Sequence, residues 1–145
     1  MSENSFEHYW KYFEIHTQQR MTVFNFYLAI VGLAAAGIGI GLQQGVKYNY
    51  LTSSIAIFMA LVSFIFFKLD QRVSTLIKRS EKALIFFEGE FSSDHPKLFH
   101  SDEMDSNLNS GLTTPWSFGR CFRISFFLIG NISLVLAFIP YLVNK

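Results

Sequence analysis

Few residues in this 145-residue chain have both the type and the spacing that catalysis or metal binding requires. The nearest approach to a metal-ligand set is the group Asp94, His95, His100 and Asp102. Its spacing matches no recognised ligand pattern, and the lone cysteine, Cys121, excludes a disulfide framework. The chain has no glycine-rich phosphate loop, nucleophile elbow or His-Glu zinc motif. We therefore expect a protein that is not an enzyme and that holds no cofactor or metal ion.

Two asparagines, Asn25 and Asn131, stand out because they lie inside long apolar segments. An unpaired amide costs more than about 1 kcal/mol in lipid, so each is expected to hydrogen-bond with another helix or with water. A role in contacts between helices is favoured, and the lining of a pore is the alternative. The apolar segments carry no charged residue at their centres, which argues against a proton relay, a voltage sensor or a charge-coupled transporter.

Small residues recur in the first apolar segment. Gly37, Gly41 and Gly45 follow one another at four-residue spacing, and Gly32 and Ala36 form a second pair. Such stripes let helix backbones approach closely in lipid, where packing takes the place of the hydrophobic effect. The partner is either another span of the same chain or another copy, and the sequence leaves both open.

Three long runs without a charged residue predict the helices that carry these asparagines and glycines. Charge-free runs cover 26 residues from Met21, 20 from Tyr48 and 21 from Ile124. About 20 apolar helical residues cross a bilayer core, where a helix satisfies its own backbone. A soluble helical bundle would instead show a polar stripe every three to four residues. We predict a single all-α integral membrane domain over residues 1–145, with transmembrane helices at 22–42, 50–68 and 121–143.

The distribution of basic residues predicts the orientation of these spans. Ten of the 12 Lys and Arg residues fall in the N-terminal segment and the long loop, whereas Lys47 and Lys145 fall on the other side. Cytoplasmic segments carry the excess of Lys and Arg. We expect a multi-pass protein of the bacterial inner membrane with a cytoplasmic N-terminus and a periplasmic C-terminus. The net charge of +1 argues against direct nucleic-acid binding.

The N-terminal segment, residues 1–20, has an amphipathic pattern with an aromatic face that includes Phe6, Tyr9, Trp10 and Phe13. It either lies on the inner membrane surface or packs on the extension of the second span. Whether this helix continues into the first span is left open.

The second span continues beyond the lipid. No Gly or Pro interrupts Leu51–Glu88, which predicts one helix of about 38 residues. We expect its C-terminal half to lie in the cytoplasm. Residues 69–118 then form a cytoplasmic helix and an acidic loop. Basic residues at the inner interface, where anionic headgroups attract them, are Arg20, Lys68, Arg72, Lys78, Arg79 and Lys82.

Two stretches together resemble a known class of proteins. They are Tyr12–Met21 with Phe24–Tyr27, and Lys68–Arg72 with Leu76-Ile77 and Ser80–Leu84. They are similar to small multi-pass membrane effectors encoded in bacterial anti-phage defence loci, including the transmembrane proteins associated with retrons. Val73 and Ser80 stand where that pattern often has Asn and Gly.

The resemblance implies a mechanism. In such systems a cytoplasmic partner, a protein or a ribonucleoprotein, senses infection and releases the membrane protein. The released protein then damages the inner membrane, which causes abortive infection. We therefore expect a membrane effector that forms a homo-oligomer and permeabilises the inner membrane. The alternative is a non-toxic membrane anchor that scaffolds a cytoplasmic complex.

Overall fold

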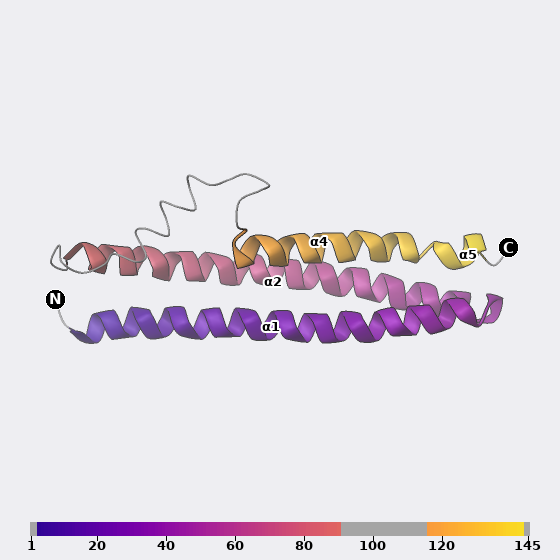
Figure 1. Ribbon diagram of the computed structural model, residues 1–145, viewed down its shortest axis with the longest axis horizontal. Coiled ribbons are helices and arrows are strands. Elements are labelled where there is room, and N and C mark those ends of the chain that lie inside the picture. Colours follow the sequence, from indigo (N-terminus) through magenta and orange to yellow (C-terminus); the bar gives the residue numbers. More distant parts are fainter. Residues whose placement is uncertain (1–2, 91–115, 144–145) are drawn as a thin grey trace. The chain divides into compact units, whose positions relative to one another are not determined.

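The computed structural model describes residues 3–90 and 116–143, and Figure 1 labels their helices. In chain order these are α1 (Glu3–Gln43), the 3-10 turn η1 (Val46–Tyr48), α2 (Asn49–Glu90), α4 (Phe118–Leu136) and α5 (Ile139–Val143). No strand occurs within the described ranges, and three of the helical segments are long and apolar enough to cross a membrane. The predicted all-α fold, with three helices that are long and apolar enough to span a membrane, is confirmed.

The helix bounds resolve a point that the sequence left open. α1 is one unbroken helix of 41 residues, so the amphipathic N-terminal segment continues into the first span. α2 runs for 42 residues, slightly longer than predicted, because nothing in Leu51–Glu88 breaks a helix. The third span-capable stretch covers Phe118–Leu142, close to the predicted 121–143, but it is interrupted, since α4 ends at Leu136 and α5 begins at Ile139.

Contacts along the chain define two compact units. The first unit contains the described residues 3–20, 72–90 and 116–117, and the second contains 21–71 and 118–143. The second unit therefore includes all three predicted spans. α1 and α2 each contribute one segment to both units.

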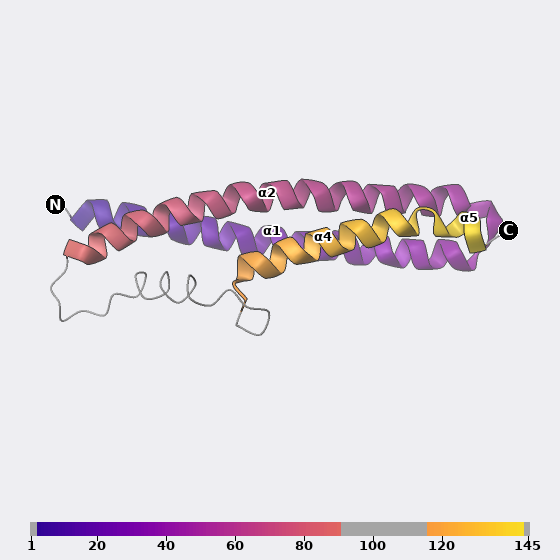
Figure 2. The same cartoon turned by 90° about the horizontal axis from the view of Figure 1, so that it is seen from above.

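The second unit is a bundle in which segments of α1, α2 and α4 lie side by side (Figures 1 and 2). One core cluster joins Tyr27, Val62, Phe122 and Phe126. The other joins Ile38, Ala56, Met59 and Ala137. Most of the remaining apolar surface faces outward: only 17%, 33% and 22% of the most hydrophobic windows of the three spans are buried. A monomeric soluble protein rarely exposes that much apolar surface, whereas a bilayer would cover it.

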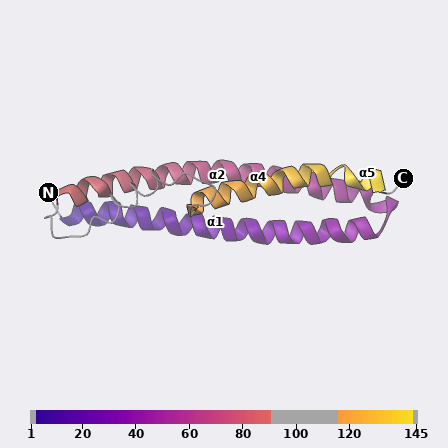
Figure 3. The ribbon, with the colours of Figure 1, turned by 45° about the horizontal axis from the view of Figure 1, so that its top comes forward.

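Two backbone features shape the ends of this bundle. Gly45 has φ of 77°, a left-handed conformation that glycine adopts at little cost, and it lets the chain turn from α1 into α2. Ala137 and Phe138 interrupt the last helix before α5 (Figure 3). Pro140 causes this break, because its ring clashes with the carbonyl of Leu136 and it has no N–H to donate.

The first unit is a pair of helical segments held together by aromatic rings. Phe87 contacts Phe6 with ring centroids 6.3 Å apart and Tyr9 with centroids 5.4 Å apart. Ile77, Leu84 and Phe87 are buried. Of the two alternatives for the N-terminal segment, packing on the extension of the second span is the one observed.

Candidate functional site

The polar groups inside the second unit are its most distinctive chemical feature. The hydroxyls of Tyr27 and Ser63 are hydrogen-bonded at 2.9 Å in the buried core. Ser63 donates its single O–H to the carbonyl of Met59 in its own helix, at 2.9 Å, so the Tyr27 hydroxyl is the donor in the bond to Ser63 Oγ. This pair links α1 to α2 beside the ring of Phe126, which meets the Tyr27 ring edge to face with centroids 4.6 Å apart. Polar groups enclosed in an apolar bundle must be paired in this way.

A second polar cluster forms where Pro140 breaks the last helix. Tyr141 donates its N–H to Phe138, three residues back, at 3.2 Å. The carbonyl of Ala137 therefore loses its usual partner, and the buried hydroxyl of Ser53 donates to it instead. The side-chain amide of Asn49 donates to the carbonyl of Pro140 at 3.0 Å. Side chains of α2 thus satisfy the backbone carbonyls of Ala137 and Pro140 beside this break.

The sequence did not single out Tyr27, Asn49 or Ser53. Pro140 was the available signal, since a proline inside an apolar run frees a carbonyl that needs a donor. Four serines of the spans donate to backbone carbonyls of their own helices: Ser54, Ser63, Ser125 and Ser133.

The two predicted asparagines lie on the outside of the bundle. Asn25 and Asn131 are both exposed. Asn131 donates from Nδ2 to the carbonyl of Phe127 in its own helix, at 2.7 Å. The structure therefore does not bring these two amides into contacts between helices of one chain.

Asn131 lines an open groove of about 380 Å³ between α2 and α4. Its lining includes three small residues that are buried or half-buried, Ala60, Ser63 and Gly130, which we call its floor, and the exposed rings of Phe64 and Phe127. At one end Lys68 lies over the ring of Phe64, 5.8 Å from its centroid. The groove is apolar apart from these few polar groups.

The small residues of α1 divide into an inward and an outward set. A Cβ added at Gly41 would lie 3.2 Å from Thr52 Cβ and closer still to Thr52 Oγ1, and one at Gly37 would contact Ile55 at 3.5 Å. These two glycines therefore face α2. Gly32 has nothing within 4 Å of such a Cβ, and Ala36 is exposed. Gly45 belongs to the turn that follows α1.

The predicted basic residues are distributed over both units. Lys68, in the second unit, is exposed and donates to Gln71 Oε1 at 3.4 Å, and Arg20, in the first unit, is half-buried. The other four are exposed and, at 3.6 residues per turn, share one face of α2: Arg72, Lys78, Arg79 and Lys82. That face lies opposite the buried Ile77, Ser80 and Leu84.

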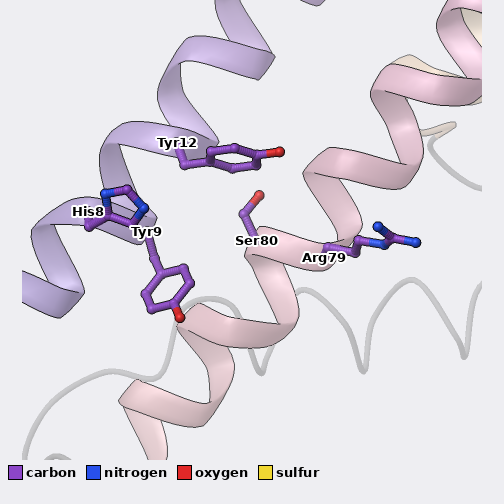
Figure 4. A pocket seen from close by; sticks show the side chains of 5 residues that line it. All are labelled: His8, Tyr9, Tyr12, Arg79 and Ser80. Atoms are coloured by element: carbon purple, nitrogen blue, oxygen red, sulfur yellow. The ribbon is translucent and has the colours of Figure 1, made fainter.

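A small open cavity of about 220 Å³ lies within the first unit, lined by His8, Tyr9, Tyr12, Arg79 and Ser80 (Figure 4). The hydroxyls of Tyr12 and Ser80 point toward one another, whereas the guanidinium of Arg79 points away from the rings of α1. Ser80 bonds to the carbonyl of Ile77 at 2.7 Å. The cavity therefore presents aromatic faces and hydroxyl groups.

Some predicted features fall elsewhere. The group Asp94, His95, His100 and Asp102 and the acidic loop beyond Glu90 lie outside the described residues. In the ranges that are described, no three His, Cys, Asp or Glu side chains gather as a metal site would require. Cys121 is a free, exposed thiol.

The fold and these sites define a small all-α protein with three span-capable helices and paired polar groups inside an apolar bundle. CD-NTase-associated protein 19 from Escherichia coli is 54% identical over 138 residues, which cover 95% of this chain and 91% of that protein. The chain therefore belongs to the family of CD-NTase-associated protein 19. No family model and no solved structure matches it. This membership supports the expected association with anti-phage defence, but not with a retron in particular.

Proposed function

We propose that this protein is the membrane effector of a bacterial anti-phage defence system. On infection it is released by a cytoplasmic partner, assembles into homo-oligomers and permeabilises the inner membrane, so that the infected cell dies before phage matures. The protein acts without catalysis or a cofactor. The name of its relative favours a CD-NTase, in place of a retron reverse transcriptase, as the cytoplasmic component that controls release.

The observation that carries this proposal is the exposure of Asn25 and Asn131 on otherwise apolar spans. An amide that faces lipid is a cost to a single copy, because hydrocarbon offers no hydrogen bonds. The same amide becomes favourable when copies assemble or when water enters between them. Exposed amides therefore fit a protein whose active form is an assembly.

The proposed topology places the N-terminus in the cytoplasm and the C-terminus in the periplasm. In that orientation the first unit, with Arg72, Lys78, Arg79 and Lys82 on one exposed face of α2, lies on the side of the anionic headgroups and of any cytoplasmic partner. Control by that partner would act on this unit.

The test is expression of the full chain without partners, with growth and membrane potential followed by a voltage-sensitive dye. We expect depolarisation within minutes and arrested growth. A double variant, Asn25→Leu with Asn131→Leu, should insert normally and depolarise much less. Ser54→Ala is the matched control, because Ser54 is an exposed polar residue whose hydroxyl already bonds to Tyr50 in its own helix. Unchanged potential after expression, and after phage challenge of cells carrying the whole system, would contradict the proposal.

A second candidate is a non-toxic membrane anchor that scaffolds a cytoplasmic complex. The first unit favours it, because exposed Tyr9 and Trp10 and the basic face of α2 suit a protein partner. Deletion of the gene separates the two functions. Loss of an anchor should scatter the complex into the cytosol, whereas loss of an effector should leave the complex intact and the membrane undamaged during infection.

A further inference from the structure

The groove between α2 and α4 presents one polar side chain whose hydrogen bonds are incomplete. Asn131 uses one of its two amide N–H bonds on the carbonyl of Phe127. No partner is seen for Oδ1 within the described part of the chain, and the side chain is exposed. Asn131 therefore offers one free donor and one free acceptor from the groove.

The depth of Asn131 limits what can satisfy it. The residue lies eight positions after Arg123 and eleven before Leu142, so it is about 12 Å and 16 Å from those residues along the axis. In a bilayer core about 30 Å thick this is close to the middle. Acyl chains have no hydrogen-bond donor, and headgroup amines do not reach this depth. The donor that Oδ1 needs must come from protein or from water drawn in by protein.

A second copy of the same chain supplies that donor by geometry. Copies inserted in one orientation are related by an axis along the membrane normal, so each residue meets its neighbour's residues at its own depth. At the depth of Asn131 the facing amide is Asn131 itself. An amide is self-complementary, because each can donate its free N–H to the other's oxygen.

We infer that a second copy of this chain seats its α4 in the groove between α2 and α4, with the two Asn131 amides hydrogen-bonded to each other. This inference rests on the proposed function, because it names the contact through which copies assemble.

The shape of the groove fits a helix from another copy. Ala60, Ser63 and Gly130 form its low floor, and small residues let helix backbones approach closely in lipid. Beside that floor, Phe64 and Phe127 are 60% and 66% exposed. Across a two-fold axis the protruding rings of one copy meet the low floor of the other. A phospholipid tail with its phosphate near Lys68 would also fill the groove, but it would leave the amide of Asn131 unpaired.

Cross-linking tests the contact in membranes. In a Cys121→Ala background, Asn131→Cys should form a disulfide-linked dimer on mild oxidation. Ile132→Cys is the matched control: it is equally deep and 55% exposed, but it is turned about 100° around α4 and does not line the groove. Cross-linking at 131 no stronger than at 132, or cross-linking at 131 only to a protein of different mass, would overturn the inference.

A second measurement tests the amide itself. The purified full chain, labelled at its C-terminus for energy transfer, is reconstituted in vesicles of phosphatidylethanolamine and phosphatidylglycerol and diluted with lipid. Asn131→Leu should raise the dissociation midpoint about tenfold. Asn131→Gln, which keeps the amide, should recover most of that loss, and Ser54→Ala should match the unsubstituted protein. A monomer at every dilution, or equal midpoints for Asn131→Leu and the unsubstituted protein, would overturn the inference.

These outcomes separate the inference from the proposed function. Dimers that form through residue 131 without any depolarisation in cells would remove the proposed function and leave the interface standing. Depolarisation without cross-linking at residue 131 would remove the inferred interface and leave the proposed function standing.

Discussion

The two units of this protein differ most in the surfaces that they expose. In the second unit paired polar groups, such as Tyr27 with Ser63, lie among apolar core clusters, and most of the surface of the spans is apolar. In the first unit the interior holds Ile77, Leu84 and Phe87, while Arg72 and Lys78 are exposed. The same helix, α2, contributes to both. This difference is the one that we expect if lipid surrounds the second unit and water surrounds the first.

The assignment of the two units to lipid and to water predicts very different effects for the same charge placed on the surface of each unit. Ile57 and Phe86 are 57% and 62% exposed, and Ile57 lies mid-way along the second span. Ile57→Lys should cost about 3 kcal/mol of insertion free energy, because a central lysine is taken from water into hydrocarbon. We expect most of the protein to be lost from the membrane fraction. Phe86→Lys should change its amount little, since a surface substitution in water costs within about 0.5 kcal/mol.

Fractionation followed by quantitative blotting measures both variants. Equal loss of Ile57→Lys and Phe86→Lys would contradict the assignment of the two units to different solvents. Unchanged membrane amounts for both would contradict it as well.

Much of the fold follows from the sequence for a physical reason. A charge-free run of 20 residues has few stable forms other than a spanning helix, and a stretch without Gly or Pro predicts the long α2 within two residues at each end. The interruption of the third span was missed, although Pro140 signals it.

The polar contacts were less accessible from the sequence. Asn131 stands out in an apolar run, but its exposure depends on which side of α4 packs on α1 and α2. Tyr27 resembles any interfacial tyrosine until the register of α1 and α2 places it opposite Ser63. That register depends on side-chain packing over the whole interface, which no local pattern records.

Substitution of the glycines of α1 should change the free energy of unfolding by an intermediate amount. Gly41→Ala should destabilise the second unit by about 2 kcal/mol, because the new methyl group would overlap Thr52. Gly32→Ala should be neutral or slightly stabilising, since nothing lies within 4 Å of the added atom and alanine favours a helix. Denaturant titration in detergent micelles compares the free energies of unfolding. Equal effects at both positions would mean that Gly41 does not face α2.

This division matters for tests of assembly. A bulky residue at Gly41 would disturb the fold of a single copy through Thr52, so any loss of toxicity would not report on contacts between copies. Substitutions at Gly32 or Ala36 alter the outer surface alone. The sequence left both kinds of partner open for the whole stripe, and the structure assigns only Gly37 and Gly41 to contacts within the chain.

The smallest predicted effect concerns the polar cluster at Pro140. Ser53→Ala removes the donor to the carbonyl of Ala137 and should cost about 1 kcal/mol of unfolding free energy in micelles. Pro140→Ala restores a backbone N–H and removes the clash with Leu136, so the helix can continue and satisfy its own carbonyls. In that background Ser53→Ala should cost close to nothing.

The coupling between the two substitutions in a double-mutant cycle measures the bond that the proline requires. Additive effects would mean that Ser53 stabilises the bundle by packing alone. The polar cluster would then not compensate for the break in the last helix, and the Tyr27–Ser63 pair would be the remaining case of polar groups that stabilise the interior of the second unit.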